Sequence, residues 1–146
     1  MNMKQLLLSV LVFVLGFTTY SQQADSKLCD VYSVSQLEHF RQVSPQSIDY
    51  MNFYVNNVVT IVDFPKGKQL ETQQLFKKDP KTGELLTDEI TSLDLINFNP
   101  YLYNCKSASN KNTYYTIGST KKLLVMYSVQ EMARKYKQYQ NNNKEK

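Results

Sequence analysis

The stretch from Thr113 to Tyr127 constrains the fold of this chain more than any other, because it has the pattern of a β-hairpin. Residues 113–117 and 122–127 are rich in β-branched and aromatic side chains, which strands favour. The residues between them, Gly118-Ser119-Thr120-Lys121, have the composition of a turn. We therefore predict two antiparallel strands joined by this turn.

A helix is predicted to follow the hairpin directly. Ser128-Val129-Gln130-Glu131 places a hydroxyl three residues before a carboxylate, which is the spacing of a capping box. Apolar side chains then recur on one helix face, at Val129, Met132, Ala133 and Tyr136. This pattern predicts a helix over Val129–Tyr139 whose apolar stripe packs on the sheet, and a disordered polar tail at residues 141–146.

Two further helical patterns precede the first strand. Ser35-Gln36-Leu37-Glu38 is another capping-box sequence and predicts a short helix over residues 35–43. Ser44-Pro45 suits the first turn of a second helix, which we expect to run to Asn56-Asn57. Val58–Phe64 is then almost continuously apolar and rich in β-branched residues, which predicts a strand covered on both faces.

The middle of the chain has weaker signals. Asp79–Glu84 has turn composition, and its flanks within residues 69–92 predict either a loose hairpin or short helical turns. Leu93–Phe98 predicts a strand that ends before Pro100, and residues 104–112 a polar loop. Together these elements predict one α+β domain over residues 22–140. It has a small, mostly antiparallel sheet of about four strands, with two N-terminal helices and a C-terminal helix packed on it.

The N-terminus has the pattern of an export signal rather than that of a membrane anchor. As a helix, the apolar run Leu6–Phe17 would reach about 18 Å, short of the ~30 Å hydrocarbon core of a bilayer. Small side chains at Thr19 and Ser21 suit signal peptidase. We therefore predict that residues 1–21 are a cleaved signal peptide and that the protein is exported to the periplasm or exterior of a bacterium, without a stable membrane span. A lipid anchor would need a cysteine directly after the cut, and Cys29 lies further downstream.

Cys29 and Cys105 are the only cysteines in the chain. Disulfides persist in exported proteins, so we predict a bridge between these two residues. The alternative is a pair of free thiols. A catalytic cysteine fits the sequence less well, because His39 is the only histidine and no Cys-x-x-Cys pair is present.

Several common chemistries lack their residues in this sequence. The Gly118 turn does not begin a phosphate loop, because a strand rather than a helix is predicted after it. The acidic group Asp88, Glu89 and Asp94 does not have calcium-loop spacing, and His39 has no second histidine to complete a zinc site. We therefore expect no cofactor and no metal. The net charge of +4 comes mainly from lysine, with few arginines, so we expect no nucleic-acid partner.

Tyrosine is abundant, with 11 tyrosines and no tryptophan in the chain. Tyrosine offers a large contact area at low entropic cost, so a ligand or protein surface built from tyrosines is physically reasonable. We predict that Tyr101 and Tyr103 form an exposed binding cluster, because polar residues flank them: Asn97, Asn99 and Asn104. The alternative is that most tyrosines pack on the sheet with their hydroxyls at its rim.

These observations predict a small noncatalytic protein of the cell envelope that binds an unknown envelope protein, a peptide or a glycan through a tyrosine-rich surface. The alternative is a small hydrolase that acts on envelope polymers. We prefer the first because the sequence lacks the usual nucleophile and base pairs and the usual sets of metal ligands. A hollow that gathered two carboxylates with separated pKa values would favour the second.

Overall fold

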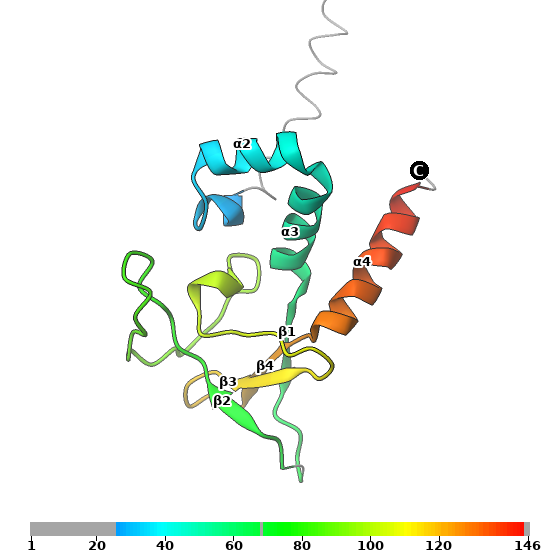
Figure 1. Ribbon diagram of the computed structural model, residues 1–146. Coiled ribbons are helices and arrows are strands. Elements are labelled where there is room, and N and C mark those ends of the chain that lie inside the picture. The colour runs from blue at the N-terminus through cyan, green and yellow to red at the C-terminus, as the bar shows by residue number, and fades with distance from the viewer. Residues whose placement is uncertain (1–25, 68, 145–146) are drawn as a thin grey trace, which may run out of the picture.

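The computed structural model describes residues 26–67 and 69–144 and has the predicted α+β architecture. A four-stranded sheet has the order β1-β4-β3-β2, and in Figure 1 the helices lie above it. The strands are β1 (Val59–Asp63), β2 (Thr72–Gln74), β3 (Thr113–Thr116) and β4 (Lys122–Met126). The β1–β4 and β3–β4 pairs are antiparallel, and the β2–β3 pair is parallel.

The predicted hairpin is confirmed. Strands β3 and β4 pair from Thr113 opposite Met126 to Thr116 opposite Leu123. Gly118 in the connecting turn has a φ of +48°, and a Cβ atom on it would lie 2.4 Å from the carbonyl oxygen of Ile90. Both the backbone conformation and the lack of space therefore require glycine here.

The prediction that the Val58–Phe64 strand is covered on both faces is wrong. Strand β1 is an edge strand, and Val62 is 40% exposed. The strand buried on both faces is β4, the neighbour of β1 and β3, where every residue from Leu123 to Met126 is buried. Val59 and Ile61 still pack against the hydrophobic core, so β1 is covered mainly on one face.

The middle of the chain contains one strand that the sequence did not predict. Strand β2 pairs in parallel with β3, with Thr72 opposite Tyr114. Beyond it, Lys78 and Leu85 form an isolated antiparallel bridge around the predicted Asp79–Glu84 turn, which agrees with the loose hairpin.

The predicted strand at Leu93–Phe98 is wrong, because residues 95–97 form a turn instead. One Asp94 carboxylate oxygen accepts a hydrogen bond from the Ile96 N–H at 2.9 Å, and the other accepts one from the Asn97 side-chain amide at 2.7 Å. This local bonding gives the backbone an alternative to a sheet ladder.

The two N-terminal helices are α2 (Val34–Val43) and α3 (Pro45–Asn57), close to the predicted ranges. The cap of α2, however, is Ser33 rather than Ser35. The Gln36 N–H donates to the Ser33 hydroxyl at 3.3 Å, and the Ser33 N–H donates to the Gln36 side-chain oxygen at 2.9 Å. The capping box therefore begins two residues earlier than expected.

Helix α4 (Val129–Lys144) continues past Tyr139 into the segment for which we predicted a polar tail. Its apolar stripe is only partly used. Met132 is fully buried and Tyr136 is half-buried, whereas Val129 is 52% exposed and Ala133 is exposed. The packing face is therefore narrower than the sequence pattern.

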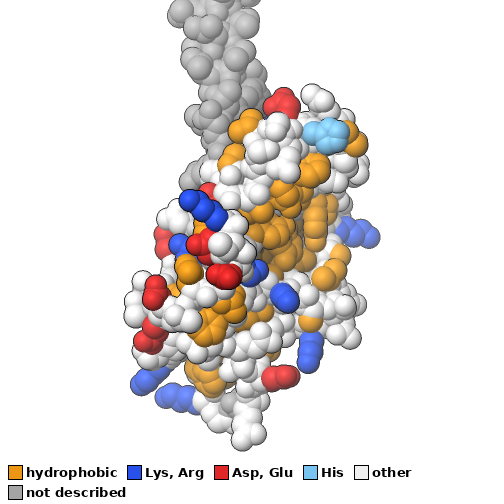
Figure 2. Space-filling view, turned by 60° about the vertical axis from the view of Figure 1, so that its left-hand side comes forward, with side chains coloured by type: hydrophobic (Ala, Val, Ile, Leu, Met, Phe, Trp, Pro, Cys, Tyr) orange, Lys and Arg blue, Asp and Glu red, His pale blue; other side chains and the backbone are white. Residues whose placement is uncertain are grey.

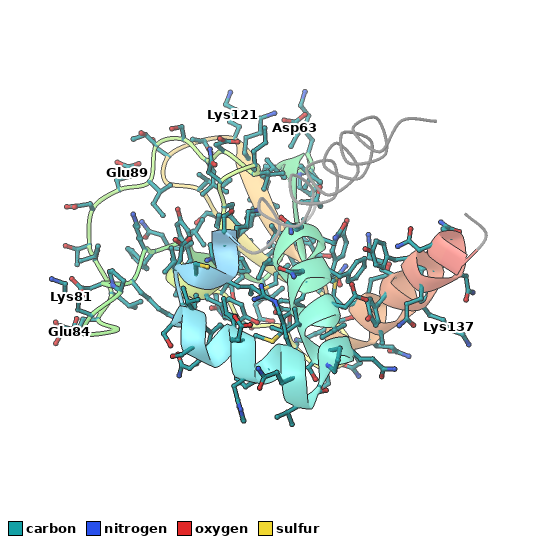
Figure 3. The ribbon with its side chains drawn as sticks, turned by 90° about the horizontal axis from the view of Figure 1, so that it is seen from above. Asp63, Lys81, Glu84, Glu89, Lys121 and Lys137 are labelled. Carbon is teal, nitrogen blue, oxygen red and sulfur yellow. The ribbon has the colours of Figure 1, made fainter. Side chains whose placement is uncertain are left out.

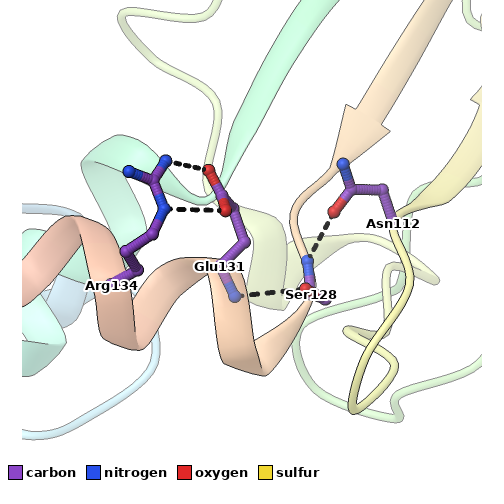
Figure 4. Close-up of polar contacts among 4 residues, drawn as sticks. All are labelled: Asn112, Ser128, Glu131 and Arg134. Carbon is purple, nitrogen blue, oxygen red and sulfur yellow. Dashed lines mark hydrogen bonds and ion pairs between the residues drawn. The ribbon is translucent and has the colours of Figure 1, made fainter.

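The N-terminus of α4 has half of the predicted capping box. The Glu131 N–H donates to the Ser128 hydroxyl at 3.2 Å, but the Glu131 carboxylate pairs with Arg134 at 2.6 and 3.1 Å (Figure 4). The Ser128 N–H instead donates to the side-chain oxygen of Asn112 at 2.9 Å. The loop before β3 thereby completes the cap.

Buried side chains form two cores. The larger lies between the sheet and the helices and includes Phe53 of α3, Leu124 and Met126 of β4, and Met132 of α4. The smaller lies among residues 26–29, α2 and α3, and its buried members are Leu28, Leu37, Ile48 and Val55. In the part of the chain that the structure describes, no helix combines the length and the apolar character needed to cross a bilayer.

The predicted disulfide is not present, since Cys29 and Cys105 are both free thiols. Cys105 is buried in the larger core with Phe98 and Tyr115, whereas Cys29 is exposed. Packing turns the Cys105 side chain into an apolar cluster and leaves Cys29 exposed to solvent. The predicted signal peptide, residues 1–21, lies outside the described residues.

Candidate functional site

An open hollow of about 430 Å³ contains one of the two tyrosines predicted to bind a ligand. It lies where α3 faces the short helix η1 (Pro100–Leu102) and the loop after it. Figure 2 shows hydrophobic side chains gathered in a hollowed region of the surface, with Lys and Arg side chains near its rim. The lining residues among those described are Tyr54, Lys78, Pro100, Tyr101, Cys105, Lys106, Ser107 and Met126.

Tyr101 is held in place by the residue that begins η1. Asn99 is buried, and its side-chain oxygen accepts a hydrogen bond from the Tyr101 N–H at 3.2 Å. The side-chain amide of Asn99 donates to the Lys27 carbonyl oxygen at 2.6 Å. One asparagine thus caps η1 and ties it to the start of the described chain.

The Tyr101 ring faces Tyr54 of α3, with their centroids 6.0 Å apart. Burial, and to a lesser extent the nearby phenols of Tyr32, Tyr54 and Tyr50, raise the pKa of Tyr101 to about 12. Tyr101 nevertheless remains 36% exposed. It therefore presents a neutral, partly accessible aromatic surface across the neutral pH range.

The hydroxyl groups in the hollow are already engaged. The Tyr54 and Ser107 hydroxyl oxygens lie 3.1 Å apart, and the Ser107 hydroxyl donates to the Tyr127 carbonyl oxygen at 3.0 Å. This chain of contacts fixes α3 to the loop and to the end of β4. What the hollow offers a ligand is chiefly apolar surface and charge.

The charge comes from two lysines beside a buried thiol. Lys78 is half-buried and Lys106 is exposed, and both line the hollow. Burial raises the pKa of the Cys105 thiol to about 12, although the positive charge of Lys78 opposes the shift. The thiol is therefore protonated at neutral pH and acts as an apolar group.

Tyr103, the other predicted binding residue, lies in a different environment. Its ring stacks on Phe98 with centroids 4.5 Å apart, and it packs against the larger core. The polar neighbour Asn104 accepts a hydrogen bond from the Phe76 N–H and donates one to the Gln74 carbonyl oxygen. Tyr103 and Asn104 therefore support the fold, and only Tyr101 lies in the hollow.

A second group of aromatic side chains packs between α3 and α4. The rings of Tyr50 and Tyr136 are 5.0 Å apart, and Phe53 lies 5.2 Å from Tyr136 and 5.1 Å from Tyr139. The Tyr136 hydroxyl donates to the Asp49 carboxylate at 2.7 Å. These tyrosines pack within the fold, but between two helices rather than on the sheet as the alternative interpretation predicted.

The acidic group does not form a metal site. Glu89 accepts a hydrogen bond from the Ser119 N–H at 2.7 Å, and in Figure 3 it lies at the periphery, as do Lys81 and Glu84. Asp94 closes its own turn, as described above. Within residues 26–67 and 69–144, no three His, Cys, Asp or Glu residues are placed to hold a metal ion, and His39 is exposed on α2.

A larger hollow, of about 680 Å³, adjoins the first described residue, Ser26. Its described lining includes Lys27, Asp30 and the turn at residues 95–97, and no tyrosine is among these described lining residues. The hollow at Tyr101 is therefore the better match to the predicted tyrosine-rich surface.

Sequence reasoning found Tyr101 but missed the residues that face it. Tyr54 belongs to a tyrosine-rich stretch of a predicted helix. Helical spacing places it on the same helix face as Met51, and this was the one sequence signal for its position. Lys78 and Lys106 have no such signal, because they line the same hollow only through long-range folding.

Comparisons with known protein families, curated protein sequences and solved structures found no match to this chain.

Proposed function

We propose that this is a small exported protein of a bacterial envelope that binds a peptide, a glycan or a partner protein, without catalysis, through the hollow at Tyr101. The observation that carries the proposal is that tyrosines from distant parts of the sequence come together at this hollow. Tyr54 and Tyr101 come from separate segments, yet their rings pack against each other with centroids 6.0 Å apart and both line an open hollow, with the phenols of Tyr32 and Tyr50 nearby.

The chemistry of the lining supports binding rather than hydrolysis. Hydrolysis of a polymer by paired carboxylates would need two of them in the site. Among the described residues, the lining of this hollow includes no Asp or Glu, so no observation here favours the hydrolase alternative. Aromatic rings at the rim of an apolar hollow instead suit recognition, since each buries a large area with few rotatable bonds.

Substitution of Tyr101 tests the proposal. We expect Tyr101→Ala to weaken binding to ligands found on peptide and glycan arrays by about tenfold or more, as the loss of an aromatic anchor does. Tyr139→Ala is the matched control, because Tyr139 is exposed to a similar degree but lies on α4 among other rings. Equal binding by wild type and Tyr101→Ala would contradict the proposed site.

Sequencing the N-terminus of protein isolated from the envelope tests export. We expect the mature chain to start near Gln22.

A further inference from the structure

The hollow at Tyr101 has positive charge in its lining and, among the described lining residues, no negative charge. Lys78 and Lys106 are its only charged lining residues among those described. Two of the other described lysines have carboxylate partners: Lys111 lies 3.7 Å from Glu71, and Lys122 pairs with Asp63. Within the described residues, neither the Lys78 nor the Lys106 ammonium has such a partner. An anion entering the hollow therefore displaces no existing ion pair.

Both lysines have fixed backbones. The Lys78 N–H donates to the Leu102 carbonyl oxygen at 2.8 Å. The Lys106 N–H donates at 2.9 Å to the hydroxyl of Tyr115, which is itself buried. Because the main chain is anchored at both positions, only the side-chain stems need ordering when an anion binds.

We propose that the ligand of this hollow is an acidic peptide segment. Its Asp or Glu carboxylate meets Lys78 and Lys106, and a neighbouring apolar side chain packs on Tyr54 and Tyr101. This assignment rests on the proposed function and narrows its ligand class by charge complementarity.

The lining favours a peptide over a glycan. Sugar hydroxyls need acceptors as well as donors, and the described lining residues include no Asp, Glu, Asn or Gln. The hydroxyls of Tyr54 and Ser107 are already engaged. Apart from the Tyr101 hydroxyl, what remains is an apolar surface beside two cations, and an acidic side chain next to an apolar one is complementary to both.

A random heptapeptide library displayed on phage, selected on the purified protein, provides the probe. We expect the enriched sequences to place Asp or Glu beside an aromatic or aliphatic residue. A synthetic copy of an enriched peptide should bind about tenfold more weakly to a Lys78→Gln, Lys106→Gln double variant. Its affinity should also fall as salt is raised, because both ammoniums reach solvent.

Lys81→Gln is the control, since it removes the same charge from an exposed residue that Figure 3 places at the outer end of its loop. It should change the affinity by less than about twofold. Enriched peptides that depend on Tyr101 but lack acidic residues, or that ignore the double variant, would overturn the acidic assignment and leave the proposed function standing. Binding to glycans alone, dependent on Tyr101, would do the same. No ligand dependent on Tyr101 would overturn both proposals.

Discussion

At the scale of single residues, burial separates the two cysteines chemically. Burial raises the pKa of the Cys105 thiol to about 12, so at pH 8 roughly one such thiol in ten thousand is ionised. Cys29 is exposed. Because the thiolate is the reactive species, we predict that a disulfide reagent modifies Cys29 rapidly and Cys105 only after denaturant is added. Absorbance of the released thiolate measures both phases in reduced, folded protein.

Two single variants assign the phases of this thiol reaction. Cys29→Ser should remove the rapid phase, and Cys105→Ser should leave it unchanged. Two rapidly reacting thiols in the folded protein would show that Cys105 is not buried as described.

The local sequence predicts that a serine caps the N-terminus of α2, but it does not determine which serine. Ser33 and Ser35 each stand three residues before a side chain with an acceptor, Gln36 and Glu38. Ser33 directly follows the turn at residues 30–32, whose Tyr32 N–H donates to the Leu28 carbonyl oxygen at 2.8 Å. That contact belongs to the fold rather than to the capping pattern, so the sequence could not separate the two.

At the scale of elements, the start of α4 depends on a loop residue. Ser128 is buried, and its N–H has the Asn112 side chain as its acceptor. We predict that Asn112→Ala lowers the free energy of unfolding by about 1–3 kcal/mol, because it leaves a buried donor unsatisfied. Urea denaturation followed by circular dichroism measures the change.

The ion pair one turn further along α4 provides the comparison. Arg134→Ala breaks the contact with Glu131 but leaves the Ser128 cap intact. Since the pair lies on the surface, the free energy of unfolding should change by less than about 1 kcal/mol. A larger cost for Arg134→Ala than for Asn112→Ala would contradict the role given to the loop.

Elements with strong local patterns were predictable, and those made by distant pairing were not. The β3–β4 hairpin and the helices α3 and α4 each have a start signal and a periodic pattern within their own residues. Strand β2 is short and polar, Thr72-Gln73-Gln74, and exists because it pairs in parallel with β3, some forty residues later. The sequence of β2 itself contains no pattern that predicts its pairing with β3.

At the scale of the whole molecule, the same distinction applies to the hollow. Its lining joins α3, the bridge at Lys78, η1 and the loop with Cys105. The abundance of tyrosine led to the prediction of Tyr101, but only the tertiary fold places Tyr54 against it. Tyr103, two residues away, packs on Phe98 instead, so proximity in sequence did not predict membership of the site.

The fold as a whole depends on α4 docking through Met132, which is fully buried in the larger core. We predict that Met132→Asp lowers the free energy of unfolding by several kcal/mol, roughly 3 or more, because it places an unpaired charge in that core. Thermal and urea unfolding followed by circular dichroism measure the loss.

Ala133→Asp is the matched control, since it adds the same charge to the next residue of α4, which is exposed. Its cost should stay below about 1 kcal/mol, the difference in helix propensity between the two residues. The apolar stripe read from the sequence contains both Met132 and Ala133, so it predicts that both substitutions are damaging. The structure predicts that only Met132→Asp is damaging, because α4 turns a narrow face to the core. An unchanged melting temperature for Met132→Asp, or equal losses for the two variants, would show that α4 docks through another face.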